Sequence, residues 1–262
     1  MGENILMKIK HNIKINNIVM LICLIVFILY IYCYRLTNDE VSSMILLGAD
    51  YKTFTLGLGE YFRLITCGFC HFNILHLLAN MISLYSLGSF IENIYGPKKY
   101  LIYLFGGILI GSLTSGVLNT NIIESGISAA LYTFLVIVFM YFFLYHNAIS
   151  LNFVSIIFIN IGLNFLPNVA WQGHLGGAVA GLIFFFIDYY ERIHNKTYNL
   201  IFKLLLIFTI IFLSDKYYST KGSIKDFDGT DYQYVNYTAR YFPLISEHYA
   251  DKIYNYYMEK GK

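Results

Sequence analysis

Long apolar stretches separated by short polar segments dominate the pattern of this chain. A helix needs about 20 mostly apolar residues to cross the hydrocarbon core of a bilayer. Seven stretches fit: Ile18–Tyr34, Asn73–Glu92, Tyr100–Leu118, Ser128–Tyr145, Ile149–Leu166, His174–Tyr190 and Leu200–Ser214. The shortest contains Lys203, whose long side chain can extend to the membrane surface. The pattern predicts an all-α polytopic membrane protein.

The first apolar stretch follows a basic leader, which is typical of both a signal peptide and a membrane anchor. Its run of 17 residues, 18–34, is longer than a usual signal-peptide core. The following segment, CYRLTNDE, offers no small-x-small cleavage site. These two features favour an anchor.

Lysine and arginine in the short flanks predict the orientation, because basic residues gather on the cytoplasmic side. Three basic segments share one side if there are seven spans, and they carry Lys8, Lys10 and Lys14, then Lys98 and Lys99, then Arg192 and Lys196. We therefore predict a cytoplasmic N-terminal segment 1–17, a helical core 18–190 and an additional span 200–214. The loop 35–72 and the polar, tyrosine-rich tail 215–262 are expected outside, with the plasma membrane as the location.

Composition agrees with this pattern. The chain of 262 residues is 57% hydrophobic and only 13% charged, whereas soluble domains carry roughly a quarter charged residues. Its mean hydropathy is +0.57, and 25 Tyr and 22 Phe suit aromatic belts at the membrane interfaces. A net charge of +2 gives no reason to expect nucleic-acid binding. The expected partners are the lipid bilayer and other membrane proteins.

The four cysteines form no apparent disulfide framework. Cys67 and Cys70 make a Cys-x-x-Cys pair followed by His71 and His76, which raises zinc or redox chemistry as an alternative. No second ligand pair occurs at metal spacing, so we expect no metal ion. His71 is interpreted as a residue of the membrane interface.

Five polar residues in the apolar spans are candidates for function, because placing them there costs free energy. They are His76, Asn80, Ser128, Tyr132 and His174. The second, fourth and sixth spans run in the same direction, and each begins near one of His76, Ser128 and His174. These three are therefore expected at one depth near the outer face. His76 shares a helix face with Asn80, and Ser128 with Tyr132, because each pair is four residues apart.

These residue types at one depth predict nucleophilic catalysis. A serine hydroxyl is a poor nucleophile until a base takes its proton, and the imidazole of His174 suits that role at neutral pH. No Asp or Glu lies in the outer half of these spans, so we expect a Ser128–His174 dyad with Tyr132 packed against the imidazole. The Ser128 N–H at a helix start, together with His76 and Asn80, would donate to the oxyanion.

Small residues allow close approach around these groups. Gly177 and Gly181 form a Gly-x-x-x-Gly pair beyond His174, and Gly126 permits a tight approach to Ser128. Each residue also has a purely structural interpretation. A membrane serine often bonds its own helix backbone, a histidine at a helix start is often a cap, and an asparagine often joins helices. The joint pattern favours the catalytic interpretation.

Five ordered motifs lie between Glu60 and Asp188, half the chain: Phe62-Arg63, HFNILHLLANM, GSFIENIYG, GISA and GHLGGAVAG. In kind and order they resemble those of the rhomboid intramembrane serine proteases. Phe62-Arg63 stands where this family usually has Trp-Arg. HFNILHLLANM matches its His-x-x-x-Asn segment, and GSFIENIYG matches its Gly-x-x-x-Glu-x-x-x-Gly. GISA stands at its Gly-x-Ser-Gly nucleophile motif, and GHLGGAVAG at its Ala-His-x-x-Gly-x-x-x-Gly.

The resemblance implies a six-helix rhomboid core with one additional C-terminal transmembrane helix. It implies Ser128 as nucleophile, His174 as general base, and His76, Asn80 and the Ser128 amide as the oxyanion hole. The family also places a tyrosine one turn after the serine, as Tyr132 is here. The implied activity is cleavage of single-span membrane proteins in or beside their transmembrane segment, at a site open to the outer face. No cofactor is implied.

Three positions depart from the family motifs, namely Phe62, Ala129 and Gly173. The methyl group of Ala129 is nearest the nucleophile, and we expect activity to survive it because alanine adopts helical angles easily. An inactive relative that binds membrane clients is the alternative function, but such members usually lack the serine or the histidine. A transporter or channel is not favoured, because the polar residues cluster at one depth and no matched pair of broken helices is visible.

Overall fold

The computed structural model describes residues 14–118, 123–145, 170–220, 240 and 251–252. Within these ranges the structure is helical, with a single isolated antiparallel bridge between Asp50 and Glu124. The α-helices are α1 (Ile15–Thr37), α2 (Glu40–Leu46), α3 (Arg63–Thr66), α4 (Ile74–Ser83), α5 (Ser89–Leu118), α6 (Ser128–Tyr145), α8 (Trp171–Arg192) and α9 (Lys196–Ser219). Short π-helical turns cover Thr53–Gly57 and Leu84–Gly88, and a 3-10 turn covers Cys67–Phe69.

Five helical stretches in the described ranges are long and apolar enough to cross a membrane. One of them, Ile74–Leu118, has 45 residues, too many for one crossing. Its helix is broken at Gly96, where φ is +82°, and it restarts with Pro97. This stretch therefore supplies both the second and the third predicted span. The chain is a polytopic membrane protein, and the predicted fifth span, Ile149–Leu166, lies outside the described residues.

The predicted span limits agree with the helices to within a few residues. The fourth span coincides with α6 at both ends. Helices α1, α8 and α9 run several residues further than the apolar stretches, because polar residues also extend a helix into the interface. Helix α9 continues to Ser219, so residues 215–219 of the predicted polar tail are helical.

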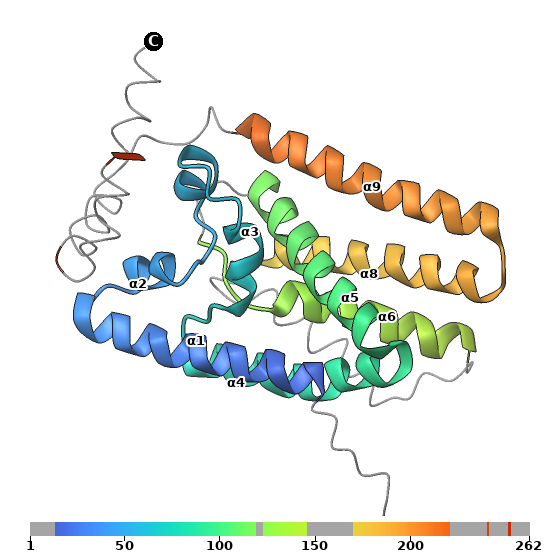
Figure 1. Cartoon of the computed structure of the whole chain (residues 1–262), viewed down its shortest axis with the longest axis horizontal. Coiled ribbons are helices and arrows are strands. Elements are labelled where there is room, and N and C mark those ends of the chain that lie inside the picture. The colour runs from blue at the N-terminus through green and yellow to red at the C-terminus, as the bar shows by residue number, and fades with distance from the viewer. Residues whose placement is uncertain (1–13, 119–122, 146–169, 221–239, 241–250, 253–262) are drawn as a thin grey trace, which may run out of the picture.

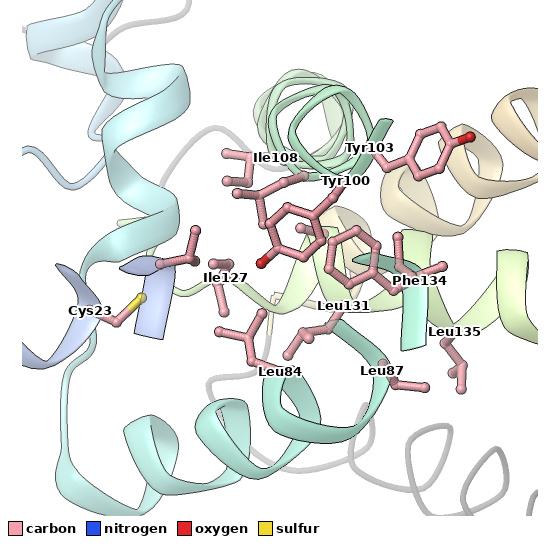
Figure 2. Packing of buried hydrophobic residues seen from close by; sticks show 14 of the residues in the cluster. Cys23, Leu84, Leu87, Tyr100, Tyr103, Ile108, Ile127, Leu131, Phe134 and Leu135 are labelled. Carbon is pink, nitrogen blue, oxygen red and sulfur yellow. The ribbon is translucent and has the colours of Figure 1, made fainter. Parts of the chain in front are cut away.

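The core of the bundle forms between α5, α6 and α8, with α1 and α4 against one side and α9 against the other (Figure 1). Figure 2 shows Tyr100 and Phe134 at its centre, and their ring centroids lie 5.3 Å apart. Cys23 brings α1 to this cluster. Because lipid is as apolar as these side chains, close packing rather than removal from water holds the helices together.

The glutamate of the Gly-x-x-x-Glu-x-x-x-Gly motif caps the first helix. The carboxylate oxygens of Glu92 accept hydrogen bonds from the backbone N–H groups of Ile15 and Asn16, at 2.8 and 2.9 Å. A negative charge there also complements the helix dipole. Gly88 leaves room for Asn16, since a Cβ at Gly88 would lie 2.2 Å from Asn16 Oδ1. The motif thus joins the start of α1 to the second span.

The loop 35–72 lies at one end of the bundle, together with the C-terminal end of α9, drawn in orange (Figure 1). Arg63 is buried inside this loop and is only 2% exposed. Its guanidinium forms an ion pair with the Glu60 carboxylate at 2.7 Å. The same guanidinium donates to the carbonyl oxygens of Ile45 and Ala49, at 2.6 and 3.0 Å. A buried charge needs such partners, so Arg63 ties α2 to α3. Lys252 adds a second ion pair to Glu60, at 3.0 Å.

Candidate active site

Ser128 is the first residue of α6, at the end of a tightly held approach segment. The segment turns at Gly126, whose φ of +106° is a left-handed conformation that favours glycine. The Gly126 N–H donates to the Cys67 carbonyl oxygen at 3.0 Å, which anchors the turn to the loop 35–72. As a first-turn residue, Ser128 has an N–H with no carbonyl in a preceding helical turn. This amide is therefore available to an acceptor beside the hydroxyl.

His174, in the first turn of α8, contacts the serine directly. Its Nε2 lies 2.8 Å from Ser128 Oγ, within hydrogen-bond distance. The ring of Tyr132 stacks on the imidazole, with centroids 4.3 Å apart and planes 8° from parallel. Stacking fixes the ring plane, and thereby points one ring nitrogen at the hydroxyl. Both Ser128 and His174 keep part of their surface exposed.

Close packing of α6 against α8 makes this contact possible. A Cβ added at Gly177 would lie 2.0 Å from the Ala129 carbonyl oxygen, and one at Gly181 would lie 2.6 Å from the Thr133 carbonyl oxygen. The Thr133 hydroxyl also donates to the Gly177 carbonyl oxygen at 2.8 Å. The Gly-x-x-x-Gly pair thus brings two helix backbones together, as small residues do in membranes.

Ala129, which replaces the glycine of the family motif, points away from the serine. It is 8% exposed, and a Cβ added at Gly111 on α5 would lie 2.5 Å from the Ala129 methyl carbon. The same position at Gly111 would be 3.0 Å from the Gly173 carbonyl oxygen. The methyl group therefore fills a space between α5, α6 and α8 that two glycines leave.

His76 and Asn80 lie beside the serine from α4. Asn73 caps this helix, accepting from the His76 N–H at 2.8 Å. A Cβ added at Gly126 would lie 2.6 Å from His76 Nε2 and 3.5 Å from Asn80 Nδ2, so both side chains reach the turn before Ser128. Asn80 is 5% exposed, and its Nδ2 has no hydrogen-bond partner among the described residues. A buried donor without an acceptor is unfavourable, which suits a group that serves a transient charge.

His71, which the sequence predicts at the membrane interface, is packed inside the protein, and its depth in the membrane stays a prediction. His71 is fully buried, its ring centroid lies 4.9 Å from that of His76, and its Nδ1 is 3.2 Å from the Phe69 carbonyl oxygen. Burial, reinforced by the neighbouring His76, lowers the pKa of His71 to about 3. His71 is therefore a neutral packing partner of His76. Its place five residues before His76 did not reveal this, because His71 precedes the helix that carries His76.

Two acidic residues, one on the segment that leads to Ser128 and one paired with it, did not stand out in the sequence. Asp50 and Glu124 exchange backbone hydrogen bonds, at 3.1 and 2.8 Å, and Glu124 lies four residues before Ser128. The Glu124 carboxyl faces α8, since a Cβ at Gly173 would lie 2.5 Å from its Oε1. Burial raises the pKa of Glu124 well above its usual value, and the Asp50 carboxyl adds to this. The only sequence signal was their presence in two loops expected on the same side.

The Cys-x-x-Cys pair is packed into the core. Cys67 Sγ lies 3.2 Å from Ser112 Oγ, and Cys70 Sγ lies 3.4 Å from the Leu47 carbonyl oxygen. Burial raises the pKa of the Cys70 thiol to about 12, which leaves it protonated and a poor metal ligand. In the part of the chain that the structure describes, no group of three His, Cys, Asp or Glu side chains is placed to hold a metal ion.

The arrangement contains the kinds of group that acyl transfer requires. It offers a hydroxyl in contact with an imidazole, at the first residue of a helix. A second histidine and an amide NH₂ group without a partner among the described residues lie beside the same turn. The structure brings together all six residues named from the sequence: Ser128, His174, His76, Asn80, Tyr132 and Gly126.

Comparison with known proteins relates the chain to the family that its sequence motifs resemble. The family profile described as the Rhomboid domain matches residues 58–191. Over 151 residues the chain is 32% identical to rhomboid protease GluP of Bacillus subtilis (strain 168). This match covers 55% of this chain and 29% of the relative. It is 31% identical over 172 residues to RHOMBOID-like protein 5 of Arabidopsis thaliana, covering 58% and 55%. For Rhomboid-like protease 2 of Toxoplasma gondii the identity is 29% over 147 residues, covering 53% and 52%.

The chain spans from under a third to about half the length of these relatives. The matched region contains the second, fourth and sixth spans and, with them, every residue of the candidate site. Since the profile covers half of the chain, and the helices that carry its motifs meet around Ser128, the chain belongs to the rhomboid family.

Proposed function

We propose that the chain is an intramembrane serine endopeptidase that hydrolyses peptide bonds in or near the transmembrane segments of other membrane proteins. The observation that carries this proposal is the 2.8 Å contact between Ser128 Oγ and His174 Nε2. Membership of a family with named proteases supports it. The alternative, an inactive protein that binds membrane clients, has no such observation in its favour.

In the proposed mechanism, His174 Nε2 takes the hydroxyl proton while Ser128 Oγ attacks the carbonyl carbon of the scissile peptide bond. The C–N bond then breaks, and the protonated imidazole gives its proton to the leaving amine. Water next attacks the acyl-enzyme with His174 again as the base, which releases the acid and restores the hydroxyl. Tyr132 holds the imidazole plane during both proton transfers.

The charge that develops on the carbonyl oxygen needs donors that are already in place. The Ser128 N–H lies at the start of α6, where the helix dipole also favours negative charge. Asn80 Nδ2, buried and without a partner among the described residues, is the second donor. His76 is the third, from the same face of α4. Water inside a membrane protein would otherwise compete for these donors, so their burial strengthens the stabilisation.

We infer that the site opens to the outer face and acts on single-span membrane proteins. The basic flanks put the N-terminus in the cytoplasm, and the second, fourth and sixth spans then begin at the outer side. A helical substrate shields its carbonyl groups, so it must unwind locally before attack. Small residues at the cleaved bond, with Gly or Pro nearby, make this unwinding easier. The plasma membrane is the proposed location.

The test is cleavage of a generic single-span substrate by the purified chain in detergent, beside the Ser128→Ala variant. We expect the wild type to cut near the outer end of the substrate span, and the variant to leave it intact. Mapping the products by mass spectrometry locates the cut. Binding of substrate without cleavage by the wild type would favour the inactive alternative, and a cut near the cytoplasmic end would contradict the orientation.

A further inference from the structure

The additional helix α9 touches the loops that carry the active site through one buried side chain. Although all residues of α9 are described, only two are buried, Asn199 near its start and Tyr217 near its end. Tyr217 is 2% exposed, whereas neighbouring Tyr218 is 56% exposed. Leu206, Ile210 and Leu213 of α9 are only partly buried against the bundle, so Tyr217 is the large side chain of this helix that is fully inside the protein.

A glycine and a lysine lie directly against this ring. A Cβ added at Gly116 on α5 would lie 2.0 Å from Tyr217 Cε2, so only glycine leaves room for the ring. Lys52 Nζ lies 5.4 Å from the ring centroid and donates to the Gly116 carbonyl oxygen at 2.6 Å. A buried ammonium over an aromatic face is attracted to it. Burial lowers the pKa of Lys52 to about 8, and the neighbouring Asp50 carboxyl opposes this shift.

From Tyr217 the contacts lead to Ser128 through Asp50. The Tyr217 hydroxyl lies 3.5 Å from Asp50 Oδ1, which also accepts a hydrogen bond from Thr55. The backbone of Asp50 is paired with that of Glu124 on the segment that enters α6. Glu124 Oε1 in turn lies against Gly173, the residue before His174. One connected set of contacts therefore runs from α9 to the backbone beside both residues of the dyad.

We propose that Tyr217 is a positioning residue for the dyad, which acts through Asp50 and Glu124 to hold the segment 123–127 where Ser128 meets His174. This proposal rests on the proposed function for its catalytic consequence. The mechanical part, the coupling of α9 to the segment 123–127, stands on the contacts alone. A side chain that fixes a loop raises the fraction of molecules in the reactive arrangement. The apparent reactivity is proportional to that fraction.

Two variants remove the contact in different ways. Tyr217→Phe removes the hydroxyl and keeps the ring, so the fold is least disturbed. Gly116→Ala expels the ring and keeps the hydroxyl. The matched control is Tyr198→Phe, which makes the same chemical change on the same helix at a side chain that is 50% exposed. All are full-length chains in the same detergent, at a temperature well below their melting points.

The first measurement is hydrogen exchange by mass spectrometry over the segment 123–127. The Glu124 N–H donates to the Asp50 carbonyl oxygen and the Gly126 N–H to that of Cys67, so both amides report on the segment. We expect about five-fold faster exchange in Tyr217→Phe, the effect of one lost hydrogen bond, and a larger effect in Gly116→Ala. Tyr198→Phe should match the wild type. Unchanged exchange in both test variants overturns the coupling, whatever the activity.

The second measurement is the rate at which a fluorophosphonate labels Ser128. We expect Tyr217→Phe to slow labelling and kcat by about three- to ten-fold with KM unchanged. In an Asp50→Ala background, Tyr217→Phe should lower neither the labelling rate nor kcat any further, because the effects of residues that act through one another are not additive. Faster exchange with unchanged labelling overturns the positioning role. If the two variants exchange faster but the wild type neither reacts with the fluorophosphonate nor cleaves substrate, the proposed function is refuted and the coupling stands.

Discussion

Gly177 is the position where helix packing bears most directly on the dyad. A Cβ there would lie 2.0 Å from the Ala129 carbonyl oxygen, about 1.4 Å short of the 3.4 Å at which ordinary contacts begin. Neither group can rotate away, because the oxygen belongs to a helix backbone. Gly177→Ala must therefore move α8 away from α6. His174 lies one turn from Gly177 and Ser128 adjoins Ala129, so the 2.8 Å contact should open toward about 4 Å, beyond hydrogen-bond distance.

A displacement of about 1 Å in a catalytic contact can lower the rate by about 10²-fold. We expect Gly177→Ala to lower kcat and Ser128 labelling by at least that factor. The matched control is Val179→Ala on the same helix, where the side chain is 40% exposed to lipid. Both variants would be compared by size exclusion and thermal unfolding before the assay. A folded Gly177→Ala variant with activity within threefold of the wild type would refute the argument that close packing sets the dyad.

Three further predictions test individual side chains. Asn80→Ala should lower kcat by about 10²-fold with an unchanged melting temperature, because the amide is a donor to the oxyanion and has no partner to lose among the described residues. A fall in melting temperature with unchanged kcat would make Asn80 structural. Ala129→Gly should keep kcat within about threefold, since the methyl group faces α5, and a tenfold rise would show that it obstructs the substrate. The stability advantage of Glu124→Gln over the wild type should grow from pH 5 to pH 8. The pKa of Glu124 is raised in the folded state, so the neutral acid stabilises the wild-type fold at low pH, and this contribution is lost as pH rises through the folded-state pKa. A melting-temperature difference that stays constant over this range would contradict the raised pKa.

The spans and the catalytic groups were predictable because lipid imposes simple rules on a sequence. A crossing needs a long apolar run, so the limits of α6 could be predicted from the order of apolar and polar residues along the chain. A polar residue inside such a run is costly, so Ser128, His76 and His174 stood out, and their positions near the span starts predicted a common depth. The distance between Ser128 and His174 required the structure, since it depends on how α6 packs against α8.

The contacts made by loop residues were not predictable, because they join positions that are remote in the chain and polar for many possible reasons. Tyr217 and Asp50 are 167 residues apart, and neither lies in a pattern that marks it. Glu124 was one of several polar residues in its loop, and its pairing with Asp50 and its contact with Gly173 are visible only in the structure. His71 lies in a segment without periodicity, so its burial against His76 had no sequence signal.

The central claim is that Ser128 is a nucleophile activated by His174. The most direct measurement is to treat the purified chain with a fluorophosphonate, digest it, and identify the modified residue by mass spectrometry, in parallel with His174→Ala. The account predicts an adduct on Ser128 in the wild type, and labelling at least about 10²-fold slower without the imidazole. Labelling of the wild type at another residue, or equal labelling of Ser128 in His174→Ala, would contradict it.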